Sequence, residues 1–100
     1  MAFVQIIEFG TSKVDEMRQL GDDWEAHAAD TSTATRRILC QDRDNPGRYF
    51  NIVFFDTYES AMENSNNPVT QEFAAKMMAL SDGPPSFYNL DVVEERELSH

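Results

Sequence analysis

Strand-like apolar runs alternate along the chain with segments that carry an apolar residue every three or four positions. A two-residue period is typical of a strand, and a period near 3.6 is typical of an amphipathic helix. The apolar runs predict four strands, near Phe3–Phe9, Thr35–Gln41, Tyr49–Phe55 and Phe87–Glu95.

The intervening segments predict helices with recognisable ends. Thr11 or Ser12 can cap a first helix that runs to about Asp30, and Asp56 or Thr57 can cap a second. The run NSNNP interrupts the second helix, because a residue before proline is pushed out of the helical region. A further helix then resumes and ends at SDGPP. The apolar stripes of the first and last helices are Val14, Met17, Leu20 or Gly21, Trp24 and Ala28, and Val69, Phe73, Met77 and Leu80.

The turn RDNPG joins the second and third strands into a hairpin, so the element order is βαββαβ. This order predicts one α+β domain over residues 1–100 with a ferredoxin-like fold. We expect a four-stranded antiparallel sheet whose helices pack on one face.

The third predicted strand is apolar on both of its faces. One face packs on the helices, but Phe50, Ile52 and Phe54 would then face water, beside Val4 and Ile6 of the first strand. A contiguous exposed apolar patch marks an interface. We therefore expect a homodimer in which this face packs on the same face of a second copy.

Charge and composition exclude several classes of partner. Eighteen acidic residues against eight basic ones give a net charge of −10, which would repel nucleic acid and anionic membranes. The clustered arginines alternate with Asp42 and Asp44, as on a solvated strand pair. The chain has no run of about 20 apolar residues and no basic leader, so we expect a cytoplasmic protein that does not contact a membrane. A single cysteine and two histidines predict no disulfide and no metal site.

The segment RYFNIVFFDTYESA resembles the antibiotic-biosynthesis-monooxygenase-like branch of the dimeric α/β-barrel superfamily. That branch places an acidic, serine-rich helix start after a strand that ends in an aromatic residue. Its members include cofactor-independent oxygenases, haem-degrading enzymes and isomerases, and their ligands typically lie between helices and sheet. The resemblance implies such a pocket here, within a dimer.

Strand parity nominates residues for this pocket. If Ile52 faces the partner, then Tyr49, Asn51 and Phe55 face the helices, and Gln5 does so by register. Buried amides need hydrogen-bond partners, which implies ordered water or a ligand. Alternatively, Gln5 and Asn51 pair with each other across the strands.

The first helix adds Trp24 and His27, three residues apart. Either can have a structural role instead: Trp24 as core, and His27 through a bond to backbone carbonyls or at the surface. Tyr58 at the rim can equally be a packing residue. Phe73 and Met77 complete the expected wall of the pocket, although methionines are also common as gap-filling core.

The resemblance also bears on cofactors. Phe55 falls where haem-degrading members place a pocket tryptophan, and Gln5 falls near their first-strand amide. Their iron-ligating histidine has no counterpart, because residues 58–80 contain no histidine. We therefore expect no haem and no other cofactor. The oxygenases without cofactor hold an electron-rich phenol with an amide and aromatic groups, which are the residue types of Asn51, Gln5, Trp24 and Tyr58.

Two functions remain open. As an enzyme, the protein would bind an aromatic or polyketide-like substrate, His27 would remove a proton, and Asn51 with Gln5 would hold the oxyanion. Alternatively, it is a non-catalytic dimer that binds a small aromatic or apolar metabolite, or a purely structural dimer.

Overall fold

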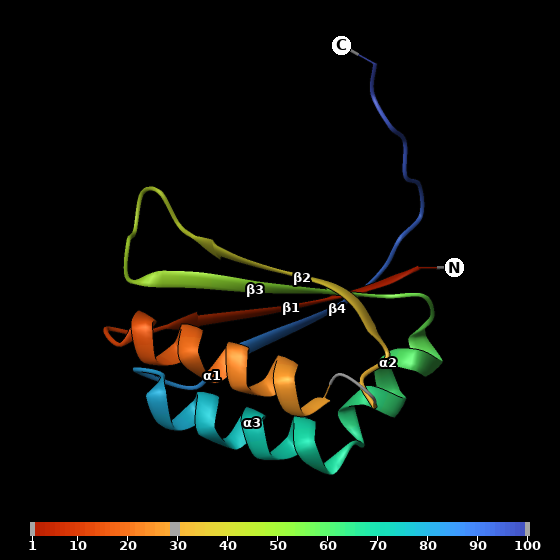
Figure 1. Ribbon diagram of the computed structural model, residues 1–100. Coiled ribbons are helices and arrows are strands. Elements are labelled where there is room, and N and C mark those ends of the chain that lie inside the picture. The colour runs from red at the N-terminus through yellow and green to blue at the C-terminus, as the bar shows by residue number, and fades with distance from the viewer. Residues whose placement is uncertain (1, 29–30, 100) are drawn as a thin grey trace.

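The computed structural model describes residues 2–28 and 31–99, and it shows one sheet with helices on one side (Figure 1). The strands are β1 (Phe3–Gly10), β2 (Ala34–Gln41), β3 (Arg48–Phe55) and β4 (Ser86–Asp91). The helices are α1 (Val14–Ala28), α2 (Tyr58–Ser65) and α3 (Pro68–Leu80). The predicted α+β ferredoxin-like order is confirmed.

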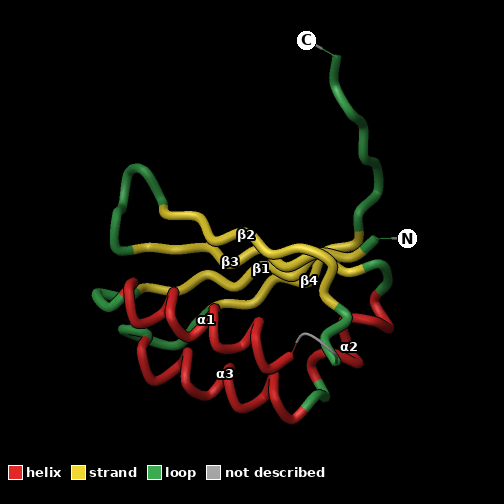
Figure 2. The backbone as a smooth tube through the Cα atoms, viewed as in Figure 1, coloured by secondary structure: helices red, strands yellow, loops and turns green. Residues whose placement is uncertain are grey.

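The four strands form an antiparallel sheet in the order β2-β3-β1-β4, and the helices cover one face of it (Figure 2). Register places Ile52 of β3 between Ile6 of β1 and Ile38 of β2. Directly paired residues in an antiparallel sheet share a face, so this row points away from the helices together with Tyr88 of β4, which is opposite Ile6.

Side-chain caps fix the helix ends. Thr57 accepts a hydrogen bond from the amide of Ser60 at the start of α2, and Asn67 caps α3 ahead of Pro68, so the predicted interruption at NSNNP is confirmed. Buried Thr11 donates to the carbonyl of Leu80 at 2.7 Å and accepts from the amide of Lys13 at 3.0 Å. This hydroxyl ties the approach to α1 to the end of α3.

One predicted boundary changes by several residues. The last strand ends at Asp91 instead of Glu95, because pairing with β1 ends where Asp91 meets Phe3, followed by one bond from the amide of Val92 to Ala2. Beyond it the chain leaves the domain (Figure 1). The predicted end of the first helix at Asp30 lies outside the described residues. None of the helices in the described ranges has the length and apolar character needed to cross a bilayer.

The buried core consists of two clusters on the helix face of the sheet. One contains Phe3, Val53, Phe55 and Ala61. The other contains Ile7, Phe9, Met17 and Tyr49. Along β1 and β3, the polar residues Gln5 and Asn51 lie between the two clusters, and both are only half-buried.

The opposite face of the sheet, called here the open face, carries a broad apolar surface. It is formed by apolar residues at the alternate strand positions that point away from the helices: Val4, Ile6, Ile38, Phe50, Ile52, Phe54, Tyr88 and Leu90. Tyr88 and Leu90 are exposed. No described helix covers this face (Figure 1). Arg36 and Arg48 lie over the rings of Phe54 and Phe50, with guanidinium carbons 5.4 and 5.1 Å from the ring centroids.

Candidate functional site

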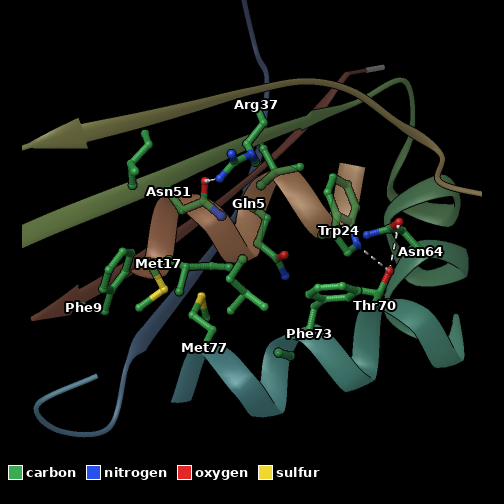
Figure 3. A pocket seen from close by; sticks show the side chains of 16 residues that line it. Gln5, Phe9, Met17, Trp24, Arg37, Asn51, Asn64, Thr70, Phe73 and Met77 are labelled. Atoms are coloured by element: carbon green, nitrogen blue, oxygen red, sulfur yellow. Dashed lines mark hydrogen bonds between the residues drawn. The ribbon is translucent and has the colours of Figure 1, made fainter. Parts of the chain in front are cut away.

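A cavity of about 120 Å³ lies between the sheet, α1 and α3, and it opens to solvent (Figure 3). For comparison, an apolar cavity of roughly 150 Å³ can hold a benzene ring. The lining residues are Gln5, Ile7, Phe9, Met17, Leu20, Gly21, Trp24, Arg37, Leu39, Asn51, Val53, Asn64, Thr70, Phe73, Ala74 and Met77. The space is therefore of a size suited to one small ring.

The walls are mostly apolar, and helical periodicity explains which residues form them. Met17 and Trp24 of α1 lie two turns apart on the face that meets the sheet, and Phe73 and Met77 lie one turn apart on α3. Small residues, Gly21 on α1 and Ala74 on α3, lie between these larger side chains. The lining of the cavity thus alternates large apolar side chains with small residues along both helices.

Asn51 and Gln5 supply amides from the floor of the cavity. The Asn51 Oδ1 accepts from Arg37 Nη1 at 3.2 Å, and the Gln5 Nε2 donates to Asn89 Oδ1 at 3.3 Å. Each amide thus bonds outward to an edge strand, and the alternative in which the two pair with each other is wrong. Register explains this, because Gln5 is opposite Val53 and Asn51 is opposite Ile7. Within the described chain, the Asn51 amino group has no recorded partner.

A second polar group lies at the α2 end of the cavity. Asn64 is 6% exposed, and its Oδ1 accepts from Ser32 at 3.1 Å and from Thr70 at 3.4 Å. The Trp24 indole donates to the Thr70 hydroxyl at 3.5 Å. Figure 3 shows these three cavity-lining side chains together at one side of the site. The chain of hydrogen bonds orients the indole as a wall.

Arg37, Asn64 and Thr70 are lining residues that sequence reasoning missed. Arg37 belongs to the arginine cluster that the sequence predicts to be solvated. Its pairing with Val53 puts it on the helix face of the sheet. Asn64 belongs to the segment NSNNP, which the sequence explains as a helix interruption and not as part of a site. The one signal in the sequence was strand alternation, because Arg37 shares the helix face with Val53 when the β2–β3 hairpin pairs these two residues.

The structure places His27 outside the cavity lining. The imidazole is exposed, and its Nδ1 lies 2.7 Å from the carbonyl oxygen of Asp23, one turn earlier on α1. Its ring is 6.2 Å from that of Phe73, which does line the site. The predicted role of His27 as a base therefore lacks supporting geometry. A hydrogen bond to a backbone carbonyl holds the ring at the surface, which is the structural alternative that the sequence left open.

Three other predicted binding residues also lie away from the cavity lining. Phe55 and Tyr49 are 2% and 7% exposed and belong to the two core clusters. Tyr49 stacks on Phe9 with ring centroids 5.8 Å apart. Tyr58 is 50% exposed and packs edge-on against Phe3. The predicted facing of the β3 residues is right, but the cavity occupies only the middle of the sheet.

The structure brings together five of the predicted site residues: Gln5, Trp24, Asn51, Phe73 and Met77. Within residues 2–28 and 31–99, no group of three or more histidine, cysteine or acidic side chains is arranged to hold a metal ion. The arrangement offers an aromatic wall, flexible methionine sides and an amide beside a guanidinium.

No protein-family model matches the chain, and no curated protein sequence matches it significantly. Solved structures do resemble it. SnoaB, a cofactor-independent oxygenase from Streptomyces nogalater, superposes with a TM-score of 0.80 at 16% identity, over 94% of this chain and 95% of SnoaB. A predicted antibiotic biosynthesis monooxygenase from Caulobacter crescentus gives 0.79 at 16% identity, over 93% of this chain and 91% of that one. A conserved protein from Methanosarcina mazei gives 0.78 at 12% identity, over 90% and 91%.

These similarities cover nearly the whole of each chain at low identity, so they bear on the fold. The chain has the ferredoxin-like fold that these solved structures share, which is the fold that the resemblance of its third strand and following helix implied.

Proposed function

We propose that this protein binds a small planar aromatic compound in the cavity and oxidises it with molecular oxygen, without a cofactor. The observation that supports this most directly is the amide of Asn51, held by Arg37 at the floor of a cavity with apolar walls. Pockets of this kind, mostly apolar with a few convergent polar groups, are the usual sites for small molecules.

The proposed chemistry depends on stabilising an anion. An ionised phenol is electron-rich and can pass an electron to oxygen, and the radical pair then combines to a ring peroxide. Loss of water from this peroxide breaks the O–O bond and leaves a quinone, so one oxygen atom stays on the ring, the other leaves as water, and the ring itself supplies all four electrons. Hydrogen-bond donors aimed at the phenolate oxygen favour the ionised form. Asn51 Nδ2 and the Arg37 guanidinium are suitable donors.

The lining supplies no carboxylate or imidazole to take the phenolic proton. In this proposal the proton therefore leaves to water at the open side of the cavity, and the protein acts by lowering the pKa of the bound phenol. His27, held at the surface by Asp23, has no part in this step.

The proposal includes a homodimer formed through the open face. Removing the apolar side chains of that face from water is favourable, at roughly 25 cal/mol per Å². A second copy supplies a complementary apolar surface of the same shape, related by a two-fold axis.

The absence of an acid or base from the lining also favours a second function, in which the cavity binds a metabolite without chemistry. Oxygen consumption separates the two. With an air-sensitive polyphenol, the enzyme should consume oxygen in proportion to product, and a binding protein should give only the uncatalysed rate.

We expect planar phenols to quench Trp24 fluorescence saturably, because this tryptophan is the only one in the chain and forms a wall of the cavity. Asn51→Ala should weaken phenol binding about 5- to 150-fold, which corresponds to roughly 1–3 kcal/mol for loss of a polar contact. Thermal unfolding should change little.

The matched control is Asn45→Ala, which removes an exposed amide from the β2–β3 turn. It should leave quenching unchanged. If a panel of phenols, quinones and aromatic acids leaves Trp24 emission unaltered while Asn51→Ala merely melts at lower temperature, Asn51 is structural and the binding proposal is wrong.

A further inference from the structure

Arg37 is the one cationic side chain among the 16 residues that line the cavity. It comes from β2, and Figure 3 shows its guanidinium beside Asn51 at the sheet side of the site. The guanidinium carries five N–H donors, and the recorded bond to Asn51 uses one of them. Arg37 therefore has donors available to a ligand.

Gly21 makes room for this guanidinium. A Cβ atom at position 21 would lie 2.7 Å from Arg37 Nη2, which is closer than real contacts allow, and 3.2 Å from its Cζ, which is tight. Glycine inside a helix is less favourable than alanine. Its presence in the middle of α1 is explained by the space that Arg37 occupies.

The ion pairs recorded among the described residues involve Arg48, Lys76 and Arg96, and none involves Arg37. This is notable in a chain with a net charge of −10. A guanidinium at a cavity wall, bonded there to a neutral amide, is suited to a planar anion, since it can bind both carboxylate oxygens in parallel.

We infer that the cavity selects aromatic ligands that carry a carboxylate beside the phenolic oxygen, so that Arg37 binds the carboxylate while Asn51 Nδ2 donates to the phenolate oxygen. This inference rests on the proposed function, since it assigns the charge of the compound that the cavity holds. The remaining ring would lie against Trp24 and Phe73.

The overall charge of the protein acts against such a preference. A net charge of −10 repels anions, so a neutral ligand would be favoured if no local cation were present. A measured preference for the anion therefore reports on the local guanidinium.

The test compares benzoate with benzamide, its neutral isostere, by quenching of Trp24 in about 0.1 M salt. We expect benzoate to bind about fivefold more tightly, a modest factor because Arg37 is exposed to solvent. Arg37→Gln should abolish the preference, and Arg43→Gln, the same charge change in the exposed hairpin turn, should keep it.

Gly21→Ala provides an independent arm that leaves the charge in place. The clashing atoms belong to the end of a flexible side chain, so the guanidinium should move out of the site while the fold is kept. We expect the benzoate preference to disappear and the thermal midpoint to hold or rise. In the Arg37→Gln background, Gly21→Ala should have no further effect on the ratio of benzoate to benzamide affinity.

The outcomes separate the two proposals. Equal binding of benzoate and benzamide, or a preference that survives both Arg37→Gln and Gly21→Ala, would overturn the charge assignment and leave the pocket intact. If neither compound nor any phenol perturbs Trp24, the binding function itself is wrong, and the charge assignment is rejected with it.

Discussion

Lysine in place of Ile52 is expected to dissociate the proposed homodimer or unfold it. Ile52 lies at the middle of the open face, between Ile6 and Ile38. In a face-to-face dimer this position is removed from water, and an ammonium group placed there has no partner. Burying such a charge costs several kcal/mol.

Sedimentation velocity at micromolar concentration provides the measurement. The wild-type protein should have twice the 11.4 kDa chain mass, and Ile52→Lys should sediment as a monomer or lose its folded circular dichroism. Ala75→Lys is the matched control, since it makes the same charge change at an exposed position of α3. A wild-type protein that sediments as a stable monomer would contradict the predicted dimer.

Phe55→Ala should lower the free energy of unfolding by about 3–5 kcal/mol, the usual range for a buried phenylalanine. Its side chain is 2% exposed and packs with Phe3, Val53 and Ala61. The surrounding strands cannot collapse into the vacated space without breaking the pairing of β1 with β3, so a cavity remains.

Urea unfolding at a fixed protein concentration measures this, because a dimer's stability depends on concentration. Phe87→Ala, the same truncation at a residue that is 53% exposed, should cost much less. A small loss of stability with a large loss of phenol binding would instead support the ligand role that the resemblance implies for Phe55.

The strand and helix order could be predicted because each element carries its own local signal. The two-sided apolar strand Arg48–Phe55 and the cap at Thr57 are examples. Parity also placed Gln5 and Asn51 correctly beneath the helices, since a strand reverses facing at every residue. These features depend on neighbouring residues only.

The composition of the site was less predictable, because it depends on how far side chains reach in three dimensions. Tyr49 and Phe55 face the helices as expected, yet packing closes the space around them and leaves it open only near Asn51. Arg37 enters the site because Gly21, sixteen positions away in the sequence, lacks a side chain. His27 stays outside it because of a carbonyl four residues earlier. No periodicity encodes these distances.

The division of the core into two clusters has a consequence for how this protein can evolve. Gln5 and Asn51 lie between the two core clusters, and leucines at these positions would join the clusters into a single core. Filling the cavity in this way would improve the packing of the interior and stabilise the fold. Under the proposed function, stability and ligand binding compete for the same volume. Without a ligand to bind, related sequences would be free to fill the cavity, and the same backbone could persist as a scaffold without a site.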